Sequence, residues 1–484
     1  MDHEHAPVLD AIAAYHERGH IPYSPPGHKQ GRGADLRVRA ILGDDVFRGD
    51  MLATGGLDDR RSSGKVIEQA QELMADAVGA DHAFFSTCGS SLSVKSAMLA
   101  VAGRHGRILV GRDAHKSVLS GLVLSGLQPT WVQPRYDPEQ RLAHPPSPQQ
   151  VGRALDRDPD VAGVLITSPT PYGTCADITA IGRLCHERGL PLIVDEAWGA
   201  HFPFHDGLPT WAMDAGADLC VVSIHKMGAG LEQGSVFHLQ GDLVDPSRLR
   251  ACADMLSTTS PNVLMYAAMD GWRRQMVQQG HELLTSALNL AADVRDRIGK
   301  LPGPRVLHDE LLGAEASKEL DPLKVLVDLA DLEISGYQAA DWLRAHHGVD
   351  VGLSDHRRIE AQLTIADDAV TADLFLDALT DLTRASELPE TAPIKLPLLE
   401  DLDLETVMLP RDAFFTRTQD IPVTEAVGRI CAEQVTPYPP GIPVLFPGER
   451  IGRQALDYLV TGVQAGMVVP DATAPQLETV RVVA

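Results

Sequence analysis

Between about residue 60 and residue 300, short apolar runs alternate with longer segments of helical periodicity. Val161–Thr167 and Leu219–Ser223 are short and rich in β-branched residues, whereas Val66–Val78 and Ile178–Arg188 repeat apolar residues at helical spacing. Strands that alternate with helices predict an α/β fold built on a doubly wound, mostly parallel sheet. Ligands of such sheets bind beyond the carboxyl ends of the strands. We therefore expect the functional residues at those strand ends.

The character of the chain changes on both sides of this region. A helix is predicted over Leu9–Arg18, ahead of a segment rich in Pro and Gly, and another over Thr424–Gln434 near the far end. The sequence predicts an arm, a large domain, a smaller α+β domain and a C-terminal domain, at residues 1–55, 56–300, 301–390 and 391–484.

Charge and cysteine usage exclude several classes of partner. The formal net charge of the 484-residue chain is -24, so nucleic acid and anionic membranes are poor candidates for partners. None of the six cysteines forms a C-x-x-C pair, which argues against a zinc site or a disulfide framework. Neither a signal peptide nor a membrane-spanning run is recognisable, so the cytoplasm is the expected location.

A lysine follows one of the apolar strands directly, in Ser223-Ile-His-Lys226. Lysine is among the residues least often buried, and burial favours the neutral, nucleophilic amine. Such an amine is what covalent attachment of a carbonyl cofactor requires. The plainer reading is a lysine just outside the strand that points to water, and the S-x-H-K pattern alone leaves both readings open.

Other strand ends carry polar groups that suit a phosphorylated, electron-accepting cofactor. Asp195 ends the run Leu190–Val194 and supplies a carboxylate, although Asp also caps loops after strands. Cys88-Gly-Ser-Ser91 precedes a helical pattern and offers backbone N–H groups for a phosphate, although Ser is a common helix cap everywhere. His115 follows the strand Arg107–Val110, where an imidazole stacks on a planar ring or simply faces solvent.

The order and spacing of these motifs resemble the Orn/Lys/Arg decarboxylases, a family of pyridoxal 5'-phosphate (PLP) enzymes of fold type I. The resemblance covers almost the whole chain. Its motifs are Ser223-x-His-Lys226, Asp195-Glu-Ala-x-Gly-Ala-His201, Gly89-Ser-Ser91, His115-Lys-Ser117, Thr167-Ser-Pro-Thr170, Pro437-Tyr-Pro-Pro-Gly-Ile-Pro443 and Pro447-Gly-Glu449. The chain resembles the short bacterial form, which lacks an N-terminal wing domain.

The resemblance implies specific roles. Lys226 would carry PLP, Asp195 would face the pyridine nitrogen, His115 would stack on the ring, and His225 or Lys226 would return a proton to the substrate. The residues implied to contact the cofactor are Gly89, Ser90, Ser91, His115, Asp195, Ala197, Ser223, His225, Lys226, Thr258 and Ser260. Of these, Thr258 and Ser260 would serve a second subunit, so the resemblance also implies a homodimer with shared active sites.

The implied reaction is decarboxylation of arginine, lysine or ornithine, a step of polyamine metabolism. Glu449 is the candidate that binds the side-chain cation of the substrate, because a buried cation needs a paired carboxylate. The alternatives are Asp355, Glu232 and Glu196.

Four positions depart from the family pattern, at Cys88, Trp198, Met227 and Glu232. They leave the reaction outcome open between decarboxylation, oxidative deamination and transamination of a basic amino acid. An aminotransferase needs an arginine that binds the substrate α-carboxylate, and Arg357 and Arg358 are the candidates. A PLP-binding regulator lacks room and basic charge for a DNA-binding domain.

Overall fold

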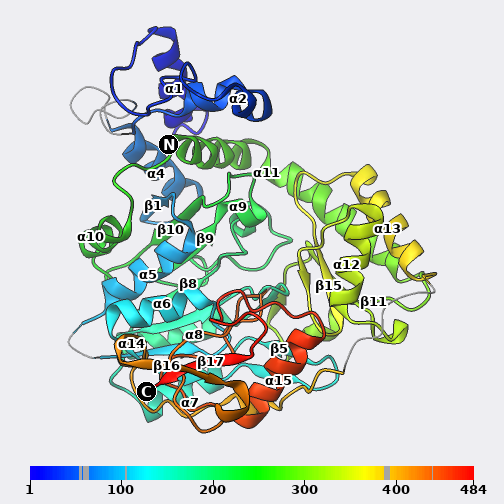
Figure 1. The fold of residues 1–484 in the computed structure, drawn as a ribbon. Helices are drawn as coiled ribbons and strands as arrows, with labels where there is room; N and C mark the ends of the chain where they lie inside the picture. Colours follow the sequence, from blue (N-terminus) through cyan, green and yellow to red (C-terminus); the bar gives the residue numbers. More distant parts are fainter. Residues whose placement is uncertain (54–56, 58–64, 104–105, 386–392, 439) are drawn as a thin grey trace. The chain divides into compact units, whose positions relative to one another are not determined.

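The computed structural model describes residues 1–53, 57, 65–103, 106–385, 393–438 and 440–484. They form two compact units (Figure 1). Unit 1 comprises Met1–Ala100, Ile193–Asp206 and Thr210–Leu283, and unit 2 comprises Val101–Leu192, Gly207–Pro209 and Leu284–Ala484. The division into four domains stays a prediction, and its boundaries after residues 55 and 390 lie outside the described residues.

Unit 1 contains strands in the order β1-β10-β9-β8. Strand β9 runs parallel to β8, whereas β10 runs antiparallel to both β9 and β1. The strands are β1 (His82–Ser86), β8 (Leu192–Asp195), β9 (Leu219–Ser223) and β10 (Ser235–Leu239). The helices are α1 (Pro7–Glu17), α2 (Leu36–Leu42), α3 (Asp44–Gly49), α4 (Val66–Ala77), α5 (Gly89–Val101), α9 (Ile224–Met227), α10 (Pro246–Leu256) and α11 (Val263–Ile298), which continues into unit 2.

Unit 2 contains the parallel strands β6-β2-β3 and the antiparallel order β11-β13-β15-β14. The strands are β2 (Arg107–Gly111), β3 (Gln128–Val132), β4 (Arg135–Asp137), β5 (Leu142–His144), β6 (Val164–Thr167), β7 (Thr174–Cys175), β11 (Arg305–Leu307), β12 (Glu319–Leu320), β13 (Lys324–Asp328), β14 (Leu353–Ser354), β15 (Arg358–Gln362), β16 (Thr418–Pro422) and β17 (Thr479–Val483). The helices are α6 (Lys116–Ser125), α7 (Pro148–Arg157), α8 (Ile178–His186), α12 (Gly336–His347), α13 (Ala369–Leu382), α14 (Pro410–Phe415) and α15 (Arg453–Gln464).

Local chemistry explains where these elements begin and end. Every residue of β8 and β9 is buried, as expected for strands covered on both faces. Helix α7 begins with a capping box in which Ser147 and Gln150 exchange hydrogen bonds, and the first helical position is a proline. Helix α12 ends at Gly348, whose left-handed φ of 64° favours glycine.

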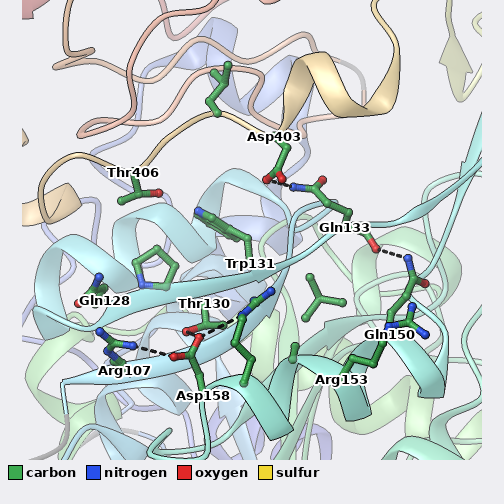
Figure 2. Close-up of a pocket in the computed structure, with 15 residues that line it drawn as sticks. Arg107, Gln128, Thr130, Trp131, Gln133, Gln150, Arg153, Asp158, Asp403 and Thr406 are labelled. Carbon is green, nitrogen blue, oxygen red and sulfur yellow. Dashed lines mark hydrogen bonds and ion pairs between the residues drawn. The ribbon is translucent and has the colours of Figure 1, made fainter.

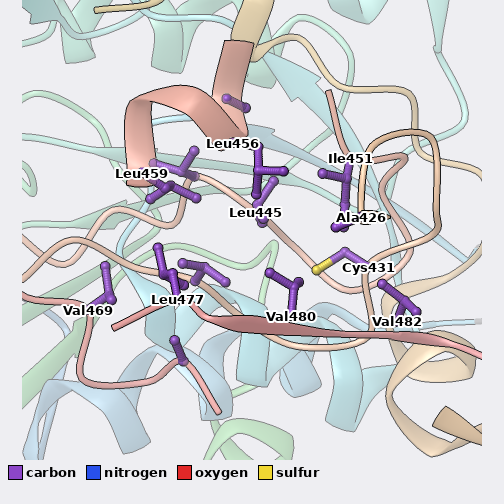
Figure 3. Close-up of a cluster of buried hydrophobic side chains, with 14 of the residues drawn as sticks. Ala426, Cys431, Leu445, Ile451, Leu456, Leu459, Val469, Leu477, Val480 and Val482 are labelled. Carbon is purple, nitrogen blue, oxygen red and sulfur yellow. The ribbon is translucent and has the colours of Figure 1, made fainter. Parts of the chain in front are cut away.

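The helix predicted over Thr424–Gln434 is wrong. Only Val423–Glu425 forms a short 3-10 turn, and Gly428 then takes a φ of +81° that ends helical backbone. Cys431 instead makes a bridge to Val482. The apolar residues that suggested a helix enter an irregular core beneath α15, which Figure 3 shows between Leu459 and Val480. The spacing of these apolar residues in the sequence reflects their burial in this core and not the repeat of a helix.

Within the part of the chain that the structure describes, no helix is both long and apolar enough to cross a membrane. Helix α11 has the length, at 36 residues, but charged side chains recur along it. The six cysteines are all free thiols.

Candidate active site

Lys226 lies in unit 1 on α9, three residues after the end of the buried strand β9. Its side chain is half-buried, and its Nζ lies 4.2 Å from the centre of the Trp198 ring, a distance suited to a cation–π interaction. Trp198 is one of the departures from the family pattern. The strand-end position predicted from the sequence is therefore confirmed by the structure.

Asp195 is the last residue of β8, the parallel neighbour of β9, and it pairs in register with Val221. The side chain is buried and accepts a hydrogen bond of 3.3 Å from the backbone N–H of Ala197. Burial raises the pKa of the Asp195 carboxyl, and the nearby positive charge of Lys226 opposes that rise. A carboxylate in this position suits a cationic group placed between the two strand ends.

Hydroxyl groups gather at the same end of the sheet. Ser86 of β1, Ser235 of β10 and Ser223 of β9 lie in one register row. The hydroxyl of Ser223 is fully buried and has no hydrogen-bond partner among the described residues, so a ligand oxygen would satisfy it.

Beyond Ser86 the chain turns into α5, which begins at Gly89 with a φ of +72° and open space where a Cβ would lie. The N–H groups of this first turn, at Ser90 and Ser91, supply the donors and the positive dipole end that anions favour. His225 donates through Nδ1 to the carbonyl of Gly234 at 3.1 Å, and burial lowers its pKa, which favours a neutral ring.

Unit 1 thus brings together most of the residues that the sequence singled out. They are Gly89, Ser90, Ser91, Asp195, Ala197, Ser223, His225 and Lys226. Thr258 and Ser260 also belong to unit 1 but are exposed in the loop after α10, where the Ser260 N–H bonds the Thr258 hydroxyl at 3.2 Å.

His115 lies in unit 2 and caps α6. Its Nδ1 accepts a hydrogen bond of 3.2 Å from the N–H of Ser117. The Pro-rich segment packs against it, because a Cβ on Gly441 would come within 2.9 Å of the imidazole Cδ2. The carbonyl of Gly441 also accepts the N–H of Lys116 at 3.0 Å. The contacts with Gly441 therefore hold the His115 imidazole in place.

We expect Gly441→Ala to displace the His115 ring. The φ of +89° at Gly441 disfavours any side chain, and the added methyl would press on the imidazole. The loss in unfolding free energy should be about 1–2 kcal/mol. Thermal unfolding and the affinity for added PLP would measure it. The same substitution at Gly43, also at positive φ but with nothing within 4 Å, is the control for backbone strain alone. Equal PLP affinity in both variants would contradict the role of Gly441.

Glu449 is almost completely buried in unit 2 and forms an ion pair with Arg112. Its Oε2 lies 3.2 Å from Arg112 Nη2 and accepts the N–H of Phe446 at 3.0 Å. Arg112 also donates to the carbonyls of Pro443, at 2.7 Å, and Val444, at 3.0 Å, and its guanidinium lies 4.3 Å from the Phe446 ring centre. We call this set of contacts the Arg112 bracket. It fixes the segment after the Pro-rich loop beside the strand that leads to His115.

The charge of Glu449 is therefore already engaged, although one oxygen, Oε1, is buried without a hydrogen-bond partner among the described residues. Burial raises the pKa of this carboxyl, and Arg112 opposes the rise. Whether Glu449 reads a substrate stays a prediction. Of the other acidic candidates, Asp355 bonds Arg358 and the Tyr172 hydroxyl, Glu196 accepts from the Cys220 thiol, and Glu232 is exposed.

The two arginines that would favour an aminotransferase are committed elsewhere in unit 2. Arg357 pairs with Asp328 at 2.7 Å and donates to the carbonyl of Glu139. Arg358 is fully buried, pairs with Asp355 at 3.1 Å and donates to the carbonyls of Gln140 and Arg141. Both guanidinium groups are therefore already engaged, and neither is available to bind a substrate carboxylate.

Sequence reasoning missed Arg112 and Asp113. Both follow β2 and both are buried, Asp113 with neither carboxyl oxygen hydrogen-bonded to any described partner. Their signal in the sequence was two adjacent charged residues directly after an apolar strand, a position like the one that identified Lys226.

Comparison with known proteins assigns the chain to a family. Residues 6–311 match the Orn/Lys/Arg decarboxylase major domain, and residues 398–470 match the C-terminal domain of the same family. An arginine decarboxylase of Halalkalibacterium halodurans is 36% identical over 484 residues, covering 99% of this chain and 98% of the relative. An arginine decarboxylase of Bacillus subtilis is also 36% identical, covering 100% and 99%.

Solved structures agree on the fold. The constitutive lysine decarboxylase of E. coli superposes with a TM-score of 0.81 at 19% sequence identity, covering 100% of this chain and 82% of that one. Lysine decarboxylase A from Pseudomonas aeruginosa gives 0.80 at 20% identity, covering 99% and 80%. The predicted α/β class with the fold type I architecture is confirmed. With two family matches over most of its length and full-length relatives at 36% identity, the chain belongs to the Orn/Lys/Arg decarboxylase family.

Proposed function

We propose that this protein is a PLP-dependent decarboxylase of a basic amino acid and that arginine is its substrate. The observation that carries the proposal is the pair of neighbouring strand ends in unit 1, with buried Asp195 on β8 and Lys226 just after β9. The choice of arginine is supported by the full-length relatives at 36% identity, which are arginine decarboxylases. Three lysine decarboxylases match less closely, at 24%, 22% and 22% identity.

The residues present fit PLP. Lys226 would bond it covalently, Asp195 would face its pyridine nitrogen, and Ser223 with the first turn of α5 would hold its phosphate. His115 would stack on one face of the ring and Ala197 would pack on the other. The cofactor, when bound, supplies an electron sink for the bond that breaks.

The side chains perform the remaining work. Asp195 provides a buried negative charge where the positive charge of the bound ring requires a partner. After the carboxylate has left, a proton must return to the substrate Cα. Lys226 Nζ is the donor we favour, because the Trp198 ring stabilises its protonated form at 4.2 Å. His225 is the second candidate donor, although burial disfavours its charged form.

A substrate panel tests this function. Purified protein with added PLP should release CO2 and the matching amine from arginine, and much less from lysine and ornithine. Borohydride should fix the cofactor on Lys226. Formation of a keto acid or of peroxide in place of CO2, or a label on Lys116 or Lys29, would overturn the proposal.

Glu449 is our proposed reader of the substrate cation, through the unpartnered oxygen Oε1. Glu449→Gln should raise KM for arginine and weaken discrimination against uncharged analogues. Because Glu449 also pairs with Arg112, Arg112→Gln is the matched control for loss of the ion pair. If both variants change thermal stability and neither changes KM, Glu449 is structural only.

We also propose a homodimer with shared active sites. Helix α1 is anchored to α11 by buried Asp270, which accepts the Val8 N–H at 2.8 Å. The segment beyond it is different, because α2 has no buried residue. Large apolar side chains exposed there are Ile21, Tyr23, Leu36, Ile41 and Leu42. An exposed apolar segment of this kind is typical of a protein interface.

Hybrids test the shared site. Chains carrying Lys226→Ala and chains carrying Thr258→Ala with Ser260→Ala should each be inactive. Mixed dimers should recover activity, because one of their two sites is then intact. Hybrids shown to have formed but lacking activity would rule out sharing through residues 258–260. The cytoplasmic location stays a prediction.

A further inference from the structure

A polar cavity of about 450 Å³ lies within unit 2. Its walls come from β3, from α7 and from residues 403–406 (Figure 2). None of the residues implied in cofactor binding lines it. A volume of this size accommodates a small metabolite.

Three arginines line this cavity in a chain whose net charge is -24. Arg107 pairs with Asp158 at 2.9 Å, and Arg157 lies 3.6 Å from the same carboxylate. One aspartate thus serves two guanidinium groups, while Arg153 is exposed and has no ion-pair partner among the described residues. Arg153 and Arg157 are four residues apart on α7, a spacing at which like charges repel. The cavity lining therefore carries three guanidinium groups against two carboxylates, Asp158 and Asp403, which leaves a net charge of +1.

Two buried polar atoms of lining residues also lack partners among the described residues. They are Nε1 of Trp131, which can only donate, and Oε1 of Gln133. The side-chain amide of Gln133 donates to Asp403 at 2.7 Å (Figure 2). Asp403 is the second acidic residue of the cavity, and this bond already engages one of its oxygens. An unsatisfied indole N–H beside unpaired guanidinium charge calls for a ligand with several acceptor oxygens.

We propose that this cavity binds a small, multiply charged oxoanion, either a phosphate ester or a polycarboxylate. Arg153 and Arg157 hold its charged group, and Trp131 donates to a further oxygen. The anion removes the repulsion between the two arginines and fills the space between α7 and residues 403–406. The proposal does not depend on the proposed reaction, because the lining residues are separate from those of the candidate active site.

Titration calorimetry on the PLP-loaded protein tests the site, since loading keeps phosphate from the cofactor position. Inorganic pyrophosphate and citrate are the two probes, and the tighter one identifies the phosphate or the carboxylate source. Arg153→Gln and Arg157→Gln should each weaken the affinity by roughly tenfold, the scale of one charge-assisted hydrogen bond. Arg384→Gln removes an exposed arginine outside the cavity and should leave the affinity unchanged.

A second readout uses Trp131. Saturation with the tighter probe should change the intrinsic fluorescence of the wild-type protein, and Trp131→Phe should lose that change. Absence of binding by both probes at about 10 mM, or equal affinity in the wild type and both α7 variants, would overturn the proposal. Thermal unfolding of each variant confirms that the fold is intact.

Discussion

Asp195→Ala is expected to lower kcat by a factor of about 10²–10³, which corresponds to about 3–4 kcal/mol of transition-state stabilisation. The carboxylate is buried at the end of β8, so no water replaces its charge when it is removed. PLP should remain bound, because Lys226, Ser223 and the first turn of α5 are unaffected. Steady-state kinetics with arginine and the visible absorbance of the bound cofactor measure the two effects separately.

The control for this variant is Asp245→Ala. Asp245 is the cap of α10 and its loss affects helix stability rather than the strand ends. Asp195→Asn keeps the shape and removes only the charge, so it should resemble Asp195→Ala in kcat. Near-normal turnover in the asparagine variant would show that negative charge at this position is not needed.

Asp113→Asn is expected to remove a large pH dependence of stability. Burial raises the pKa of Asp113 from 3.8 to about 7, and neither carboxyl oxygen has a hydrogen-bond partner among the described residues. A raised pKa means that the folded state binds the proton more tightly than the unfolded state. The stabilisation is thus complete below about pH 4 and is lost as the pH rises through 7. The difference amounts to about 4 kcal/mol.

Urea unfolding at pH 5 and pH 8 checks this expectation. The wild type should lose stability between these values relative to the variant, and the variant should be the more stable of the two at pH 8. Asp137→Asn, at a half-buried aspartate of β4, controls for general effects of pH on the chain. Parallel curves for the wild type and Asp113→Asn would show that the carboxyl stays ionised or is solvated.

The sequence identified most of the cofactor side of the site because those residues sit where local patterns end. Lys226 follows an apolar strand, Asp195 closes another, and Gly89 starts a helix, so each position could be inferred from its immediate neighbours. These signals depend on short stretches of chain, and the strand ends of a sheet collect them at one edge.

The unpredicted features depend on contacts between distant residues. Nothing near Glu449 indicates that Arg112 is its partner, and nothing near Gly441 indicates that His115 packs on it. The error at Thr424–Gln434 has the same origin, because Ile430 and Cys431 form isolated bridges with the distant residues Arg450 and Val482. The periodicity of apolar residues reports which side chains are buried, so residues buried by distant partners can show the same spacing as a helix.

The Arg112 bracket also has a consequence for biosynthesis. Its two charged members are 337 residues apart, so at typical elongation rates Glu449 is made roughly 20–70 s after Arg112. Throughout that interval the nascent chain carries a guanidinium whose buried acceptors do not yet exist. The packing around His115 is therefore completed only near the end of translation. Ribosome-bound chains that stop short of residue 449 should expose this region to chaperones and proteases.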